Sequence, residues 1–260
     1  MGFFSDLKVL YHLALKPVRG KSHAERMENF YGGQAEGYDD FRRRLLQGRE
    51  AMLQAVPWPE TGGVWVDMGG GTGFNIATMS EVVPRLEKVY LVDLASSLLG
   101  VARKRFDEKG WSHVETVEAD ATTFSPNPAG ETVATSRPDP IGEGQADIVT
   151  FSYSLTMIPD WFSAIENALR ILKPGGVIGV VDFYVSRKFP SEGRKRHRWF
   201  TRSFWPVWFA NDNVFPSGDH LPFLDRHFDT VECTESKGKV PYIPFIRMPY
   251  YYYIGRKAGG

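Results

Sequence analysis

The residues best suited to chemistry are a glycine-rich segment and two acidic residues beyond it. Residues 67–73 read DMGGGTG and follow an apolar run, whereas Asp93 and Asp120 each lie at the end of a later segment that is typical of a strand. Glycines let a backbone turn approach a bound molecule closely, and the helix that follows offers unpaired N–H groups. A carboxylate at the end of the next strand accepts hydrogen bonds from ribose hydroxyls. The spacing therefore indicates a site for a cofactor that contains a nucleoside.

Two common nucleotide motifs do not match this segment. The dinucleotide fingerprint G-x-G-x-x-G needs Gly or Ala at Phe74 or Ile76, and a phosphate-binding loop needs Gly-Lys followed by Ser or Thr. The D-x-G-x-G-x-G pattern that begins at Asp67 instead resembles the first motif of the class I S-adenosylmethionine-dependent methyltransferases. S-adenosylmethionine has an amino acid end and no phosphate, so it needs a turn that admits a zwitterion close to the backbone.

Later positions extend this resemblance. Asp93 matches the residue that binds the ribose in that family, Asp120 with Ala121 matches the position that holds the adenine amino group, and residues 171–176 (ILKPGG) resemble the turn before its fifth strand. The resemblance implies S-adenosyl-L-methionine as cofactor and S-adenosyl-L-homocysteine as product. It implies a cofactor site made of Tyr31, Tyr38, Asp67, Gly69, Gly71, Thr72, Gly73, Asp93, Leu94, Asp120, Ala121 and Ser152.

The elements that must position these residues alternate between strands and helices. Apolar runs predict strands at residues 64–66, 89–92, 114–118, 146–152, 177–183 and 250–254, and helical spacing predicts helices over about 74–83, 94–109 and 161–172. Strands that alternate with helices form a parallel sheet with crossover connections. We therefore expect an α/β fold of the doubly wound, Rossmann-like class I methyltransferase type.

The chain divides into three parts of one domain. Residues 1–60 are expected to be helical, with a capping box at residues 22–25 (SHAE) and a helix over about 35–55, and to cover the cofactor. Residues 61–186 form the cofactor-binding core, which residues 125–145, rich in proline and glycine, interrupt as a flexible surface loop. Residues 187–260 break the alternation and form a basic and aromatic elaboration that ends in a strand.

Composition excludes several classes of protein. The 260 residues include 31 basic and 31 acidic side chains, so no overall charge favours nucleic acid. The single cysteine, Cys233, excludes an internal disulfide and a zinc site of several cysteines.

Residues 1–17 have apolar residues at helical spacing but are too short and charged to span a bilayer. They either pack on the domain or lie on a membrane surface.

Motifs outside the core resemble one lipid-modifying family. Residues 29–39 (NFYGGQAEGYD) look like a segment of lipid-modifying N-methyltransferases, while residues 219–222 (DHLP) and 238–244 (GKVPYIP) are similar to the methyltransferase part of betaine-lipid synthases. The resemblance covers roughly residues 22–257. It implies three successive methylations of the amine of diacylglyceryl-homoserine, which give diacylglyceryl-N,N,N-trimethylhomoserine. The enzyme that makes diacylglyceryl-homoserine has no room in this chain, so we expect it to be a partner protein or a missing part of a longer one.

A basic and aromatic stretch agrees with a lipid substrate. Residues 187–202 hold seven Lys or Arg against one acid, Glu192, and run into a series of Trp and Phe. This mixture favours an anionic membrane interface. It is also compatible with a solvated charged face over an aromatic core, or with single-stranded nucleic acid. We expect a cytoplasmic enzyme that is peripheral to the membrane, acts on a lipid amine and binds no nucleic acid.

The residues expected to act on the substrate are an acid–histidine pair, an arginine and tyrosines. His220, beside Asp219, is a candidate proton acceptor because its ordinary pKa lies near neutrality, although the pair has an equal claim to a turn role. Arg42 is a candidate for binding a carboxylate. Tyr31, Tyr38 and Tyr153 are candidates for an aromatic cage around the methylated cation, or for closing over the cofactor. The histidines show no metal-ligand spacing, so no metal is expected.

Three other functions compete with this reading. A phosphatidylethanolamine N-methyltransferase shares the cofactor, the interface and the amine chemistry. A methyltransferase of a small molecule or a quinone ring has no need of the basic and aromatic stretch. A non-catalytic cofactor-binding module has no reason to keep the glycine turn together with Asp93 and Asp120.

Overall fold

The computed structural model describes residues 44–126, 144–210, 213–241 and 243–259. The sequence predictions for residues 1–17 and 22–25, and for Tyr31, Tyr38 and Arg42, therefore lie outside the described residues. So does most of the loop predicted over 125–145, of which residues 127–143 are not described.

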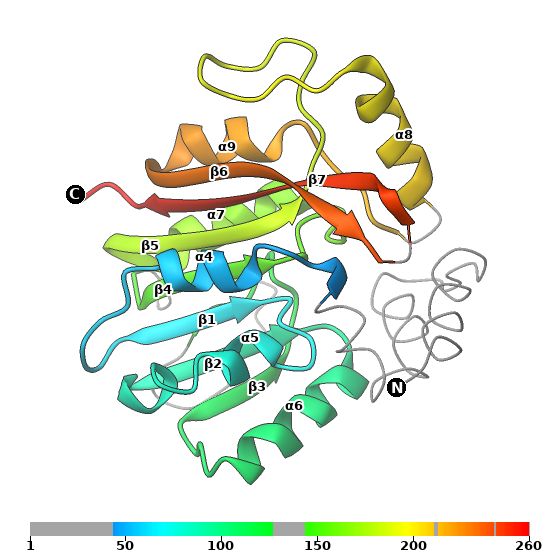
Figure 1. Cartoon of the computed structure of the whole chain (residues 1–260). Helices are drawn as coiled ribbons and strands as arrows, with labels where there is room; N and C mark the ends of the chain where they lie inside the picture. Colours follow the sequence, from blue (N-terminus) through cyan, green and yellow to red (C-terminus); the bar gives the residue numbers. More distant parts are fainter. Residues whose placement is uncertain (1–43, 127–143, 211–212, 242, 260) are drawn as a thin grey trace.

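The described ranges form one seven-stranded sheet with the order β3-β2-β1-β4-β5-β7-β6 (Figure 1). Its strands are β1 (Val64–Met68), β2 (Lys88–Asp93), β3 (Val114–Glu118), β4 (Ala146–Ser152), β5 (Leu172–Phe183), β6 (Asp229–Val240) and β7 (Ile243–Arg256). The first five strands pair in parallel, whereas β7 lies antiparallel to both β5 and β6. The strand order reverses between β1 and β4, and at such a point the carboxyl ends of strands leave a crevice.

Helices cover both faces of this sheet. They are α4 (Arg49–Ala55), α5 (Phe74–Thr78), α6 (Ser96–Glu108), α7 (Trp161–Ile171), α8 (Trp199–Phe209) and α9 (His220–His227), with a 3₁₀ turn η1 (Val83–Arg85). Alternate strand residues point to opposite faces, so Trp65 packs in the cluster with α4, α5 and α6 while Val66 packs in the cluster with α7 and α9. No helix within the described ranges is long and apolar enough to cross a lipid bilayer.

The structure confirms the predicted fold class and extends it at one edge. The strands predicted at 114–118 and 146–152 have those bounds, while the predicted final strand is longer and pairs with β6, which the sequence did not predict. All four residues at the start of β6, 229–232, are exposed. This strand is at the edge of the sheet and carries no apolar run that would predict it. An antiparallel pair therefore completes the predicted parallel sheet.

Two predicted helices are shorter than expected. The helix predicted over about 74–83 ends at Thr78, and a turn and η1 follow. Within the described residues, the helix predicted over about 35–55 is interrupted at Gly48, whose φ of 86° is left-handed, and α4 begins at the next residue. A Cβ at Gly48 would lie 2.4 Å from Cε2 of Tyr250. The close approach of β7, far away in sequence, thus fixes where α4 begins.

Candidate active site

A cavity of about 310 Å³ lies at the carboxyl ends of the central strands. The glycine turn after β1 contributes Gly69 and Gly71, and the end of β2 contributes Asp93 with its neighbours. Residues 119–122, after β3, and residues 153–154 and 157–160, after β4, complete the lining. The structure therefore brings together strand ends that are far apart in the sequence, as the crossover topology predicts.

The glycine turn needs glycine both for its backbone and for space. Gly69, Gly71 and Gly73 have φ values of 67°, 58° and 71°, which is the left-handed region. A Cβ at Gly69 would lie 2.5 Å from Cβ of Ser154, and one at Gly73 would lie 2.4 Å from Cζ of Phe106. A side chain at either position would collide with one of these neighbours. The turn therefore has glycine at both positions, and its backbone lies directly at the cavity.

Asp93 ties the glycine turn to the end of β2. Its Oδ2 accepts a hydrogen bond from the N–H of Gly71 at 2.9 Å, and its Oδ1 accepts one from the N–H of Ala95 at 2.9 Å. A carboxylate oxygen has more than one lone pair, so a carboxylate held in this way still accepts hydroxyl donors. These two bonds hold the side chain in the cavity wall.

Asp120 lines the cavity at the end of β3. Its Oδ1 accepts hydrogen bonds from the N–H and Oγ1 of Thr122, both at 2.8 Å, so a local turn fixes the carboxylate. The neighbouring Ala121 is buried, and with Leu94 and Leu98 it adds apolar surface to the lining.

The residues present fit S-adenosylmethionine. Gly69 and Gly71 would hold its amino acid end against the backbone, Asp93 would bind the ribose hydroxyls, and Asp120 would bind the adenine amino group beside the apolar surface of Ala121. These assignments follow from the two carboxylates and from the backbone of the glycine turn at the cavity. Thr72 is buried below the turn and is not among the lining residues.

Asp67 does not line the cavity. It is fully buried, and it accepts hydrogen bonds from Oγ1 of Thr150 at 2.7 Å and from Nδ2 of Asn75 at 3.2 Å. Burial raises the pKa of Asp67 to about 6, although the bonds from Thr150 and Asn75 lower it. A Cβ at Gly70 would lie 2.7 Å from Oδ2 of Asp67. Asp67 thus supports the glycine turn from beneath.

The segment after β4 forms another wall of the cavity. Tyr153 has a left-handed φ of 55°, unusual for a residue with a side chain, and its N–H donates to the carbonyl of Val181 at 2.8 Å. Its hydroxyl donates to the carbonyl of Gln47. Burial, followed by the charge of Asp182, holds the pKa of Tyr153 well above its usual range, so the phenol stays neutral. Ser152 is buried one residue earlier and is not among the lining residues.

Sequence reasoning missed Asp182, which holds the segment after β4 in place by hydrogen bonds. Its Oδ2 accepts the N–H of Thr156 at 3.0 Å, and its Oδ1 accepts Oγ1 of Thr156 at 2.7 Å and the N–H of Phe183 at 2.8 Å. The carboxylate is fully buried, and burial raises its pKa to about 7. An acid near the end of an apolar strand was the available signal, and it was overlooked because Asp182 belongs to β5 and lies outside the recognised motifs.

Neither Asp219 nor His220 is among the described residues that line the cavity, where a proton acceptor for the substrate would have to lie. His220 is fully buried in an edge-to-face contact with Trp161. Burial lowers the pKa of His220 to about 3, so the imidazole is a weak proton acceptor. Asp219 is exposed, and its Oδ1 lies 2.6 Å from Nε of Arg187. This geometry supports the packing and turn role of the pair and gives no support to His220 as the proton acceptor.

The comparisons with known proteins agree with this geometry. Residues 38–235 match the family described as "Methyltransferase domain". The ubiquinone/menaquinone biosynthesis C-methyltransferase UbiE of Pseudomonas fluorescens is 29% identical over 184 residues, which cover 69% of this chain and 66% of that protein. Its counterpart from Shewanella sediminis is 28% identical over 177 residues, which cover 66% of this chain and 64% of that protein. The match thus spans slightly less than two thirds of these relatives.

A solved structure gives the same fold. Phosphoethanolamine N-methyltransferase 2 of Haemonchus contortus, in complex with S-adenosyl-L-methionine, aligns with a TM-score of 0.66 at 14% identity and covers 92% of this chain and 60% of that chain. The family match extends over most of the chain, and the cavity has the glycine turn and strand-end acids that suit the cofactor. The chain therefore belongs to the methyltransferase domain family, and the residues of its cavity fit S-adenosylmethionine.

Proposed function

We propose that this enzyme methylates the amine of a membrane lipid, and that its acceptor is diacylglyceryl-homoserine, which it converts to the trimethylated betaine lipid in three steps. In this proposal the enzyme works at a membrane surface as a peripheral protein. A separate enzyme or a further domain supplies the homoserine lipid.

The charge of the cavity is the observation that carries the proposal. Its described lining contains three carboxylates, Asp93, Asp120 and Asp160, and no Lys, Arg or His side chain. Asp93 and Asp120 suit the cofactor. Asp160, which ends the segment after β4, is the carboxylate that remains for the acceptor amine. An acidic cavity attracts an alkylammonium acceptor and favours the cationic product of the third methylation.

The chain's own residues supply binding, orientation and a path for the proton. S-adenosylmethionine supplies a methyl group activated by its sulfonium. The acceptor amine must lose a proton before it presents a lone pair, and Asp160 or water beside it receives that proton in this proposal. The aromatic face of Tyr153 and the apolar wall of Met157 and Ile158 shield the reacting nitrogen from bulk water, and a neutral phenol ring attracts a methylated cation.

C-methylation of a quinone ring is the second candidate. It is favoured by the relatives described above, which are named as ubiquinone/menaquinone C-methyltransferases. A quinone precursor is also a membrane lipid, but its ring carries no cation, so it gains nothing from the acidic cavity.

A mass-spectrometric assay distinguishes the candidates. Liposomes would carry diacylglyceryl-homoserine, phosphatidylethanolamine or a demethylated quinone precursor, with S-adenosylmethionine in the buffer. We expect mass gains of one, two and three methyl groups on the homoserine lipid. Gains only on phosphatidylethanolamine would move the proposal to another lipid amine, and gains only on the quinone precursor would overturn it. If no lipid gains mass while the cofactor still binds, the acceptor is soluble.

A further inference from the structure

Helix α8 is apolar on two opposite sides. Trp205 and Phe209 are buried, and Phe209 stacks on Phe183 of β5 with ring centroids 5.1 Å apart. On the other side Phe200 is 61% exposed and Val207 is 74% exposed. A helix that packs on a domain normally presents polar residues to solvent. The outward face of α8 therefore serves something other than the core of this domain.

A row of aromatic rings leads from the exposed face of α8 toward the core, because Phe204, in the middle of the row, is only partly exposed and packs against the buried cluster. Phe200 stacks on Phe204 at 5.2 Å, and Phe204 contacts Trp208 at 5.4 Å, which follows the four-residue spacing along one face of a helix. Trp199 is exposed at the start of α8. We call the residues Trp199, Phe200, Phe204, Val207 and Trp208 the aromatic ridge.

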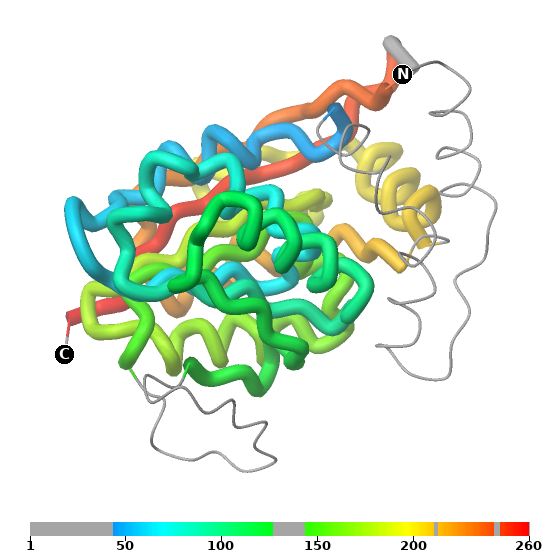
Figure 2. Tube along the Cα trace, turned by 90° about the horizontal axis from the view of Figure 1, so that it is seen from below, coloured from blue at the N-terminus to red at the C-terminus, as the bar shows by residue number. Residues whose placement is uncertain are grey.

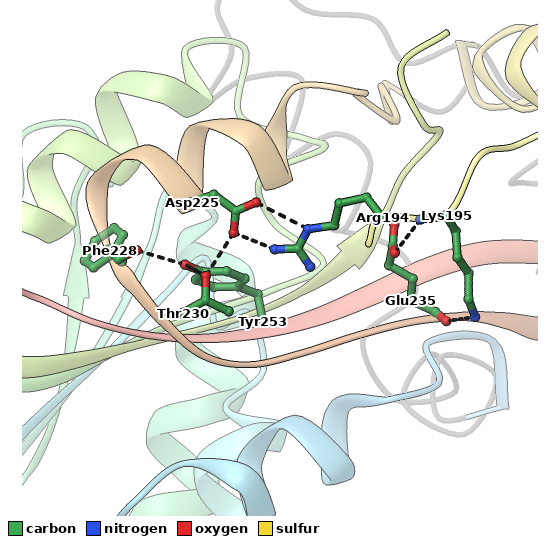
Figure 3. Close-up of polar contacts among 7 residues, drawn as sticks. All are labelled: Arg194, Lys195, Asp225, Phe228, Thr230, Glu235 and Tyr253. Carbon is green, nitrogen blue, oxygen red and sulfur yellow. Dashed lines mark hydrogen bonds and ion pairs between the residues drawn. The ribbon is translucent and has the colours of Figure 1, made fainter. Parts of the chain in front are cut away.

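Three of the seven basic residues at 187–202 bind other parts of the folded protein. Arg187 pairs with Asp219. Arg194 binds both carboxylate oxygens of Asp225, on α9, as Figure 3 shows. Beside it, the backbone N–H of Lys195 donates to the carboxylate of Glu235 at 2.8 Å, and its Nζ donates to the Glu235 carbonyl (Figure 3). These contacts hold the segment before α8 against α9 and β6, so Arg194 and Lys195 do not form part of a free basic surface.

Three other cations in the same segment are exposed and have no carboxylate partner among the described residues: Lys188, Arg196 and Arg198. Lys188 and Arg196 both lie over the ring of Phe189, at 5.3 and 5.7 Å from its centroid, and this ring is itself exposed. We call Lys188, Arg196 and Arg198 the docking cations.

Helix α8, which carries the aromatic ridge, lies on the side of the molecule toward which the parallel strands run (Figure 1). The residues that line the cavity follow the carboxyl ends of β1, β2, β3 and β4, so the cavity is on this side too. The end of β6 and the start of β7 are on this side as well in both views (Figures 1 and 2). Near the start of β7, Phe245 is 96% exposed.

We propose that the aromatic ridge and the docking cations are the surface by which the enzyme binds an anionic lipid bilayer. Trp and Phe side chains enter the boundary between headgroups and acyl chains, while neighbouring Lys and Arg contact anionic headgroups. A protein partner would match the apolar ridge, but it would not need the docking cations in the segment that leads into α8. Docking on this side directs the cavity toward the headgroups, so a lipid amine enters without leaving the membrane. The inference rests on the proposed lipid substrate, and it names the surface that gives access to it.

Sedimentation with vesicles tests the surface without any acceptor lipid. The vesicles are phosphatidylcholine alone, or phosphatidylcholine with phosphatidylglycerol, and neither is a substrate of the proposed reaction. The triple variant Lys188→Ser/Arg196→Ser/Arg198→Ser should bind the anionic vesicles about 100-fold more weakly than the wild type, because each cation near an anionic surface contributes about 1 kcal/mol. The matched control Arg103→Ser/Lys104→Ser/Lys109→Ser removes two exposed cations of α6 and one at the residue after it, and should bind as the wild type does.

A second pair of variants tests the ridge. Phe200→Ser/Val207→Ser should weaken vesicle binding by about tenfold or more through lost apolar burial. The control Phe162→Ser/Val231→Ser removes an exposed Phe and an exposed Val on α7 and β6 and should have no effect. Calorimetry with S-adenosylmethionine should give the same affinity for all four variants, which shows that they are folded.

The results separate this surface from the proposed substrate. If the ridge and docking-cation variants bind vesicles as well as their controls do, the surface assignment is overturned whatever the acceptor is. A wild type that binds no vesicles but forms dimers that Phe200→Ser/Val207→Ser dissociates would show a protein interface and would also overturn it. If the vesicle results are as expected and no lipid amine gains methyl groups, only the substrate proposal fails.

Discussion

Asp67 shows how a buried residue can serve the site without touching a ligand. Its carboxylate is enclosed by Thr150, Asn75 and the backbone of Gly70, and it receives its hydrogen bonds from the first two. Burial is the largest influence on its pKa and raises it. The glycine turn thus rests on a group whose charge is costly in the folded protein.

This raised pKa predicts a pH-dependent stability. Asp67 shifts from 3.8 to about 6 on folding, so between these pH values the folded protein holds a proton that the unfolded chain releases. The stability contributed by Asp67 is complete below pH 3.8, falls as the pH rises to 6, and is constant above. Two pKa units correspond to about 3 kcal/mol. Relative to Asp67→Asn, the wild type should lose about that much free energy of unfolding between pH 4 and pH 7.

Urea unfolding of both proteins at several pH values measures this difference. Asp182 also has a raised pKa, but it is present in both proteins, so its contribution cancels in the comparison. A difference between wild type and Asp67→Asn that does not change with pH would mean that the pKa of Asp67 is not raised by folding.

At the scale of elements, the segment after β4 is held by its neighbours on both sides. Ser154 donates to the carbonyl of Met68 at the end of β1 at 3.0 Å, Tyr153 donates to β5, and Thr156 is bound by Asp182. The carbonyl of Thr156 also accepts the N–H of Phe215, which precedes α9, at 2.8 Å. These bonds compensate for the unfavourable backbone of Tyr153 and fix a wall of the cavity.

Thr156→Val should loosen this wall and weaken cofactor binding. The change removes the hydroxyl donor and leaves a buried carboxylate with one hydrogen bond fewer, and a bond to a charged group contributes about 1.5–3 kcal/mol. We expect the KM for S-adenosylmethionine to rise about tenfold, with a smaller change in kcat. Thr156→Ser keeps the hydroxyl and should restore the KM, which steady-state kinetics would show. Equal KM values for the Val variant and the wild type would mean that the bond does not position the wall.

At the scale of the whole molecule, the cavity joins the ends of four neighbouring strands, β1 to β4. The turn after β1, the ends of β2 and β3 and the segment after β4 each contribute to one cavity. A ligand bound there contacts segments that separate on unfolding, so binding and folding are linked.

S-adenosylmethionine should therefore stabilise the protein against heat. At a concentration 100 times its Kd, we expect about 2.7 kcal/mol of added stability. For a chain of this size, that corresponds to a rise in Tm of about 5–10 °C. Asp93→Ala removes the proposed ribose ligand and the support of Gly71, so the same concentration should give a much smaller rise. Differential scanning calorimetry measures both shifts. An equal rise in the two proteins would contradict the ribose assignment.

The sequence alone determined the parts of this protein that depend on local pattern. Five apolar runs separated by helical segments predict the parallel core of the sheet, and the glycine turn with Asp93 and Asp120 predicts the place and kind of the cofactor site. Such features are readable because strand periodicity, turn geometry and strand-end acids are properties of neighbouring residues.

Only the tertiary structure decided the features that depend on distant neighbours. The strand β6 is held by pairing with β7 and carries no apolar run of its own. His220 loses its basicity because residues from other elements bury it. Arg194 and Arg196 lie in the same basic stretch of the sequence. Arg194 is bound to α9, whereas Arg196 is exposed beside Phe189. Burial, pKa and pairing are set by residues that are far apart along the chain, and no local pattern records them.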